Sequence, residues 1–317
     1  MPVPDPIGTR GRRASFAEEW RVLRAVAGAD GSVGRILDGH FNGVERVSLL
    51  APEPLRSREL QAIVAGKLLL GVWGADPIPG EGEPARLAHG ETRLIGVKTF
   101  CSGATGLDRA LVLARGPTQG PPLLAYVDLS EGVRIDTAWY RAAGMRASES
   151  HRVVFEGAPV LAVLGEPGEL LREPYFSRDA IRTAVTWAGI SDTAVDAALD
   201  LLAAKAGPKE PDDVVSLAAG RMLTARGNID SWLACAADRA DADPASLPGI
   251  STQLRESVTR SCREILDEAA RAVGSHPFAV SGPLDRARRD LELFLLQHRL
   301  EPALVRLGRQ SILDRRP

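Results

Sequence analysis

The change in apolar pattern along the chain is the feature that most constrains its fold. Between residue 71 and about residue 165, short apolar runs alternate with Gly, Pro and Asp, whereas longer amphipathic patterns lie on both sides. Runs of this length and spacing are typical of strands in an antiparallel barrel or sandwich. The six runs read LLLGVW, TRLIGVKTF, RALVLAR, LLAYVDL, RVVFEG and VLAVLG. The middle of the chain is therefore predicted to be a β domain.

Apolar residues at three- and four-residue steps predict helices on both sides of this domain. Before it, the patterns cover residues 15–26, 33–51 and 57–70. After Pro174 they cover 177–206, 211–241 and 251–273, and a last helix runs from Pro283 to about residue 309. Four helices with short connections favour an antiparallel bundle. The expected fold is α+β and multidomain, with a shortened N-terminal helical domain over 1–66, a β domain over 67–172 and a C-terminal four-helix bundle over 173–317.

The charge and the cysteines argue against several classes of protein. The 317 residues carry a formal net charge of -2, which offers no basic excess for nucleic acid. Three cysteines, far apart and without a CxxC pair, indicate neither a disulfide framework nor a zinc site. The N-terminus has no signal-peptide core, and no apolar run reaches the roughly 18 residues of a membrane span. We expect a cytoplasmic protein that binds no nucleic acid, membrane or metal.

The last predicted helix ends its apolar face at a histidine. Pro283 suits the first turn of a helix, and Asp285 lies at the positive end of the helix dipole. The apolar face comprises Leu284, Ala287, Leu291, Phe294, Leu295 and His298. Spacing alone favours a core histidine that is hydrogen-bonded to a neighbour. A functional imidazole is the alternative, and only the rest of the chain can support it.

Glycine-bearing turns beside the predicted strands are informative through their order. Each one in isolation indicates tight backbone geometry, and no catalytic triad, phosphate loop or metal-ligand spacing is evident. In chain order the segments read GVWGADP, LIGVKTFCSGA, GMRASESHRVVFEGAPV, GSHPF and RRD. Over residues 33–313 this series resembles the acyl-CoA dehydrogenase superfamily. Its Phe-x-Ser-Gly element is more similar to the branch that contains flavin-dependent monooxygenases.

The resemblance implies a flavoprotein fold that binds FAD. In this family two strand ends contact the isoalloxazine ring, and the matching positions here are Gly74, Ala75 and Asp76, together with Phe100, Cys101 and Ser102. Gly274 and Ser275 occupy the place of paired glycines, whose amides approach the pyrophosphate of an FAD held largely by the neighbouring subunit. Arg289 matches the arginine of an Arg-Asp pair in the last helix. The resemblance therefore also implies a homo-oligomer.

His298 stands where many dehydrogenases of the family carry the glutamate that removes the α-proton of the substrate. An imidazole can act as a base near neutral pH, so His298 is the first catalytic candidate. Asp179, on the first bundle helix, is the second. The main prediction is an FAD-dependent oxidoreductase that acts on CH-CH bonds of an acyl thioester or a related small molecule. The sequence does not identify the electron-transfer partner of this predicted enzyme.

Departures from the family pattern leave two alternatives. Ala75 replaces a residue whose hydroxyl bonds the flavin, and Leu300 replaces a threonine. The Arg-x-x-Phe-Gly segment that usually reaches a neighbour's FAD is not evident between residues 205 and 232. One alternative is a flavin-dependent monooxygenase-like enzyme acting on a small aromatic or amino-sugar substrate. The other is a degenerate family member without flavin, which serves as a structural or partner subunit.

Overall fold

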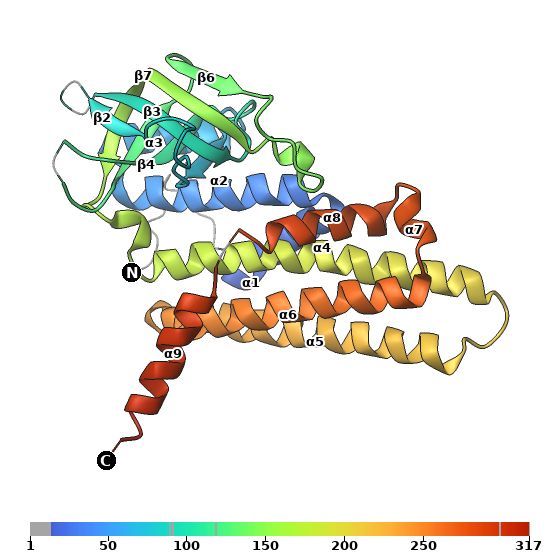
Figure 1. Cartoon of the computed structure of the whole chain (residues 1–317). Helices are drawn as coiled ribbons and strands as arrows, with labels where there is room; N and C mark the ends of the chain where they lie inside the picture. The colour runs from blue at the N-terminus through green and yellow to red at the C-terminus, as the bar shows by residue number, and fades with distance from the viewer. Residues whose placement is uncertain (1–13, 89, 91, 118, 298, 317) are drawn as a thin grey trace. The chain divides into compact units, whose positions relative to one another are not determined.

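A computed structural model describes residues 14–88, 90, 92–117, 119–297 and 299–316. The chain divides into two compact units, and its segments are coloured along the sequence in Figure 1. The first unit contains Arg35–Arg141 and Arg146–Tyr175. The second contains Ala14–Gly34, Ala142–Met145 and the described residues from Phe176 onward. These units differ from the three parts expected from the sequence, whose boundaries stay a prediction.

A seven-stranded sheet forms the centre of the first unit, which confirms the predicted β character of the middle of the chain. Its strands are β1 (Leu70–Trp73), β2 (Arg86–Ala88), β3 (Arg93–Cys101), β4 (Arg109–Ala114), β5 (Leu123–Asp128), β6 (Val133–Asp136) and β7 (His151–Leu164). They are hydrogen-bonded in the order β1-β4-β5-β7-β3-β2, and β6 pairs with β7. Every pairing between these strands is antiparallel except that of β1 with β4.

Strand boundaries differ from the expectation in two ways. The predicted runs RVVFEG and VLAVLG form one strand, β7, because Gly157 adopts a φ of 98° and Pro159 still lies opposite Arg93 of β3. The strands β2 and β6 were not predicted, since they contain only 3 and 4 residues, too few to establish a period of two. The sheet is thus more continuous than the sequence pattern indicates.

Side chains on the two faces of the sheet build two cores. Along β4, Val112 packs in one cluster with Trp73 and Phe155, whereas Leu111 packs in the other. This alternation follows from the two-residue period of a strand. The second cluster is completed by α2 (Gly31–Leu50) and α3 (Leu55–Val64). The third helix is shorter than predicted, because Gly66 ends it with a φ of 67°.

The second unit is helical. Its helices are α1 (Phe16–Ala29), α4 (Tyr175–Ala206), α5 (Asp213–Ala242), α6 (Leu247–Val273), α7 (His276–Ala279), α8 (Pro283–Phe294) and α9 (Glu301–Leu313), of which α4, α5 and α6 lie side by side (Figure 1). The single last helix predicted from Pro283 is wrong, because Pro302 cannot continue a helix and instead occupies the first turn of α9. None of the described helices combines the length and apolar character that a bilayer crossing requires.

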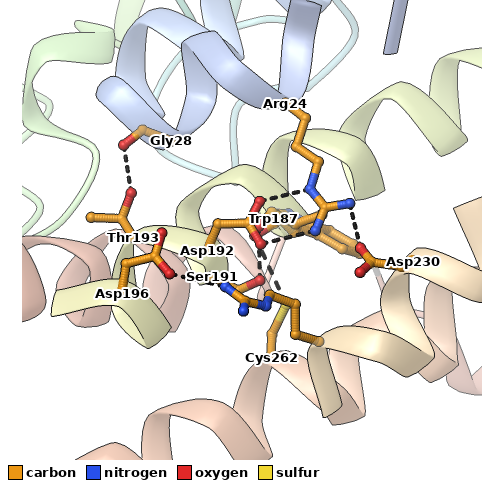
Figure 2. A network of polar contacts seen from close by, with 11 residues as sticks. Arg24, Gly28, Trp187, Ser191, Asp192, Thr193, Asp196, Asp230 and Cys262 are labelled. Atoms are coloured by element: carbon orange, nitrogen blue, oxygen red, sulfur yellow. Dashed lines mark hydrogen bonds and ion pairs between the residues drawn. The ribbon is translucent and has the colours of Figure 1, made fainter. Parts of the chain in front are cut away.

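The first helix packs with the C-terminal helices, which the sequence did not indicate. Arg24 of α1 donates from Nε and Nη2 to the two carboxylate oxygens of Asp192 on α4, at 2.7 and 2.8 Å. Its Nη1 donates to Asp230 of α5 at 2.6 Å (Figure 2). Nearby, the Thr193 hydroxyl donates to the Gly28 carbonyl. One guanidinium therefore joins three helices of the second unit.

Candidate functional site

Backbone strain points to the end of β3. Among the described residues, only Phe100, Met145 and Glu149 combine a side chain with a positive φ, at 51°, 53° and 44°. Such conformations cost about 1–3 kcal/mol each and concentrate at ligand sites. Phe100 and Glu149 belong to the first unit, at the end of β3 and just before β7. The strain therefore draws attention to a region that the resemblance also selected.

Two hydrogen-bonding residues bring the predicted flavin positions together. The buried ammonium of Lys98 donates to the Gly74 carbonyl at 3.1 Å and to an Asp76 carboxylate oxygen at 2.7 Å. The backbone amide of Thr99 donates to the Ala75 carbonyl at 3.1 Å. Desolvation lowers the pKa of Lys98, and the Asp76 carboxylate opposes that shift. The loop after β1 is thus held against the strand that carries Phe100, Cys101 and Ser102.

Phe100 presents an aromatic ring to the surface. Its side chain is 58% exposed, and its ring meets the ring of Trp139 edge-on, with centroids 4.9 Å apart. The indole Nε1 of Trp139 donates to a carboxylate oxygen of Glu81 at 2.9 Å, and this hydrogen bond holds the indole against Phe100. The sequence did not identify Trp139, because nothing in its spacing links it to residue 100. An exposed aromatic ring of this kind can stack on a planar ligand.

Ser102 offers a hydroxyl at the same strand end. Its Oγ lies 2.9 Å from Ser150 Oγ, which lies 2.8 Å from Ser148 Oγ. The Ser102 carbonyl accepts a hydrogen bond from the Trp73 indole at 3.1 Å. Cys101, by contrast, is fully buried, and burial raises the pKa of its thiol, so the thiol is not exposed to a ligand. Ser148 and Ser150 were missed, because their proximity depends on the register that places Cys101 opposite His151.

The second unit brings the other three predicted cofactor residues into one open pocket. Gly274, Ser275 and Arg289 line a hollow of about 430 Å³, together with Ala270, Phe278, Asp285, Arg288 and Glu292. Gly274 has a φ of 79°, a conformation that favours glycine. Arg289 donates twice to Asp285, at 3.1 and 2.9 Å, and this hydrogen bonding raises its pKa. Part of the guanidinium is therefore already engaged by the protein.

The Arg-Asp pair also holds the Gly-Met-Arg segment. Arg289 Nη1 donates to the Ala143 carbonyl at 2.7 Å, and the Met145 amide donates to the Asp290 carboxylate. A Cβ on Gly144 would collide with the Arg289 carbonyl, so these backbones approach as closely as glycine allows. Burial raises the pKa of Asp290, and the Met145 amide opposes the shift. The Arg-Asp pair thus has a structural role in the second unit, where it holds residues 143–145 against α8.

The structure describes only one of the two predicted catalytic residues. His298 lies outside the described residues. Asp179 of α4 forms an ion pair with Arg182 at 3.6 Å, and Arg182 also donates to Glu19 of α1 at 2.7 Å. Arg182 thus connects Asp179 to the contact between α1 and α4, and the catalytic role of Asp179 stays a prediction.

The curated relatives of the chain are monooxygenases. Dibenzothiophene monooxygenase of Rhodococcus erythropolis is 29% identical over 186 residues, which cover 54% of this chain and 42% of the relative. That of Rhodococcus qingshengii is 27% identical over 235 residues, covering 66% and 54%. The chain thus spans about half the length of the curated relatives it matches. No protein-family model matches the chain.

Solved structures match almost the whole chain. FMN-bound TdsC from Paenibacillus sp. A11-2, a dibenzothiophene monooxygenase, has a TM-score of 0.79 at 21% identity and covers 96% of this chain and 85% of its own. Methanesulfinate monooxygenase from Pseudomonas fluorescens also has a TM-score of 0.79, at 20% identity, with coverage of 96% and 84%. The chain has the acyl-CoA dehydrogenase-like fold. The resemblance seen in the sequence is therefore confirmed at the level of the fold.

The comparisons correct the predicted cofactor of this acyl-CoA dehydrogenase-like fold. TdsC and KijD3 have been solved with FMN bound, whereas the sequence predicted FAD. KijD3 matches with a TM-score of 0.79 at 22% identity and covers 95% of this chain and 81% of its own. The solved neighbours therefore contradict the prediction of FAD.

Proposed function

We propose that the chain is a flavin-dependent monooxygenase that binds FMN and oxidises a small aromatic substrate. The observation that carries the proposal is the strained, exposed Phe100 beside the Ser102 hydroxyl, in a fold shared with FMN-bound monooxygenases. The curated relatives are also monooxygenases, which favours this reading over the dehydrogenation of an acyl thioester. When bound, reduced FMN supplies the electrons with which dioxygen is activated.

The residues of the first unit would position the flavin ring. Phe100 supplies an exposed aromatic surface, and the loop of Gly74, Ala75 and Asp76 is fixed beside it by Lys98 and Thr99. Ser102 contributes a hydroxyl whose direction is set by Ser150. Hydrogen bonds from fixed donors cost little reorganisation when a ligand binds. These groups would orient the ring rather than take part in bond breaking.

The pocket at Gly274 and Ser275 would receive the phosphate of a flavin held by a neighbouring copy. Backbone amides can bind an anion without a side-chain charge, and Arg288 and Arg289 line this pocket together with their ion-pair partners Glu292 and Asp285. A second feature supports a homo-oligomer. None of the described residues of α9 is buried, and the apolar side chains of Val305 and Ile312 are 58% and 66% exposed. Apolar residues in this setting mark contact surfaces.

The proposed substrate class rests on the curated relatives. Dibenzothiophene, the compound in their names, is a flat sulfur heterocycle. His298 is the first candidate for a residue that exchanges a proton with the substrate, because an imidazole can do so near neutral pH. Asp179 is the second candidate for that step.

Oxygen consumption tests the proposal. Purified protein is supplied with FMN, a flavin reductase and NADH, and dibenzothiophene is added. The proposal expects substrate-dependent oxygen uptake and an oxygenated product. Formation of an enoyl product from an acyl thioester, with an artificial electron acceptor and no oxygen incorporation, would contradict it. Failure to bind any flavin would instead support the degenerate alternative.

A further inference from the structure

Two consecutive arginines of α8 line the pocket that contains Gly274, and their side chains are equally exposed. The exposed fraction is 36% for Arg288 and 36% for Arg289. Charge and exposure therefore do not distinguish the two. Their hydrogen bonds do, because a guanidinium binds a phosphate through N–H groups that the protein has not already engaged.

Arg289 uses all three of its guanidinium nitrogens within the second unit. Its Nε and Nη2 donate to one carboxylate oxygen of Asp285, at 3.1 and 2.9 Å. Its Nη1 donates to the Ala143 carbonyl at 2.7 Å. The side chain of Asp285 is only 16% exposed, so water screens this ion pair weakly. A ligand that recruited Arg289 would have to break these contacts and release the backbone at Ala143.

Arg288 uses only one guanidinium nitrogen. Its Nε donates to a carboxylate oxygen of Glu292 at 2.8 Å, and neither Nη1 nor Nη2 forms a hydrogen bond with another described residue. The guanidinium carbon lies over the ring of Phe278, 5.1 Å from its centre, and Phe278 also lines the pocket. This cation–π contact favours a fixed place for the side chain. Two terminal nitrogens of Arg288 are therefore available to a ligand in the pocket.

The ion-pair partner of Arg288 competes weakly with a phosphate. The side chain of Glu292 is 53% exposed, and it lies one turn further along α8. Exposed pairs at this spacing contribute little, because water solvates both charges. A phosphate monoester carries roughly −1.5 to −2 charge at pH 7 and three acceptor oxygens, against one charge on the carboxylate. Arg288 can therefore bind a phosphate through Nη1 and Nη2.

The pocket has room for such a group. Its volume of about 430 Å³ is many times the roughly 30 Å³ that one water molecule occupies in the liquid.

We propose that Arg288 is the residue of this pocket that binds the phosphate of FMN, and that Arg289 is a positioning residue. This inference rests on the proposed function, in which the pocket receives the phosphate of a flavin. It differs from the family resemblance, which selects Arg289 as the cofactor-binding arginine. Nη1 and Nη2 of Arg288 donate to phosphate oxygens, and Glu292 competes with the phosphate for the same guanidinium.

Comparison of FMN with riboflavin isolates the phosphate, because the two flavins differ only in that group. Full-length wild type and Arg288→Met are titrated with each flavin at equilibrium. We expect the wild type to prefer FMN, and Arg288→Met to reduce that preference at least about tenfold, because hydrogen bonds between charged groups are lost. The affinity for riboflavin should not change. Arg260→Met should keep the wild-type preference, since Arg260 forms a similar pair with Glu256 on α6 but does not line the pocket.

Two further variants separate binding from packing. Glu292→Gln removes the competing carboxylate at an exposed position and should raise the preference for FMN, which provides a second test if Arg288→Met does not fold. Arg289→Met should lower the midpoint of thermal unfolding, because the contacts with Asp285 and Ala143 are lost.

Three results would overturn the assignment of Arg288. They are equal wild-type affinity for the two flavins, an unchanged preference in Arg288→Met, and a lower preference in Glu292→Gln. In each of these cases flavin binding itself persists, so the proposed function is not contradicted. If the wild type binds neither flavin, the proposed function fails, and the assignment of Arg288 fails with it.

Discussion

Gly189→Ala should destabilise the second unit by forcing α1 away from α4. A Cβ at Gly189 would collide with the Arg24 carbonyl and would lie 2.8 Å from Ala27 Cβ and 2.9 Å from the Gly28 nitrogen. Overpacking of a core costs about 1–3 kcal/mol. The upper end applies here, because the obstructing atoms include backbone and no side-chain rotation can relieve the collision.

Two further effects modify this cost. Displacement of α1 weakens the contact of Arg24 with Asp192, and a hydrogen bond to a charged group contributes about 1.5–3 kcal/mol. The higher helix propensity of alanine stabilises α4 by about 1 kcal/mol, which offsets part of this loss. The free energy of unfolding should therefore fall by roughly 3 kcal/mol in all.

A matched variant gives the opposite sign. Gly220 is an exposed glycine within α5, and a Cβ there would meet no atom within 4 Å. Gly220→Ala should stabilise the unit by about 0.5–1 kcal/mol. Urea titrations followed by helical circular dichroism measure both changes. If Gly189→Ala unfolds at the same urea concentration as Gly220→Ala, the close packing of α1 on α4 is refuted.

Two predictions concern the first unit. Ser102→Ala should lower the affinity for FMN by about 0.5–1.5 kcal/mol in an equilibrium titration, the contribution of one hydrogen bond, whereas Ser130→Ala should bind like the wild type. Burial lowers the pKa of His40, whose Nδ1 accepts a hydrogen bond from the Leu70 amide at 3.1 Å. Stability from neutral His40 is thus present above its usual pKa of about 6.5 and is lost as the pH falls below it. Wild-type protein should lose more stability than His40→Gln between about pH 8 and pH 5, and equal losses would contradict this assignment.

Local patterns predicted much of the fold. The strands β1, β3, β4 and β5 and the helices α4 and α5 were identified from apolar periodicity, because each buries one face or stripe over enough residues to establish a period. The break before α9 was missed even though Pro302 signals it. The apolar face that continues to Leu295 concealed the end of α8 at Phe294.

Long-range contacts could not be predicted in the same way. The attachment of α1 to α4 depends on Arg24 meeting Asp192, which lies 168 residues away in the sequence. The series Ser102, Ser150 and Ser148 depends on the bulge between Lys98 and Cys101 in the pairing of β3 with β7. Sequence spacing fixes neither. The candidate positions rest on the family resemblance, and the FMN bound in solved neighbours contradicts the prediction of FAD.

The binding of FMN to the isolated protein tests the central claim most directly. Titration of the wild type with FMN and with FAD, followed by flavin fluorescence and visible absorption, gives both affinities. The account predicts saturable binding of FMN with a shifted spectrum, and weaker binding in Ser102→Ala. Absence of binding, or equal FMN affinity in the wild type and Ser102→Ala, would contradict the assignment of this flavin site.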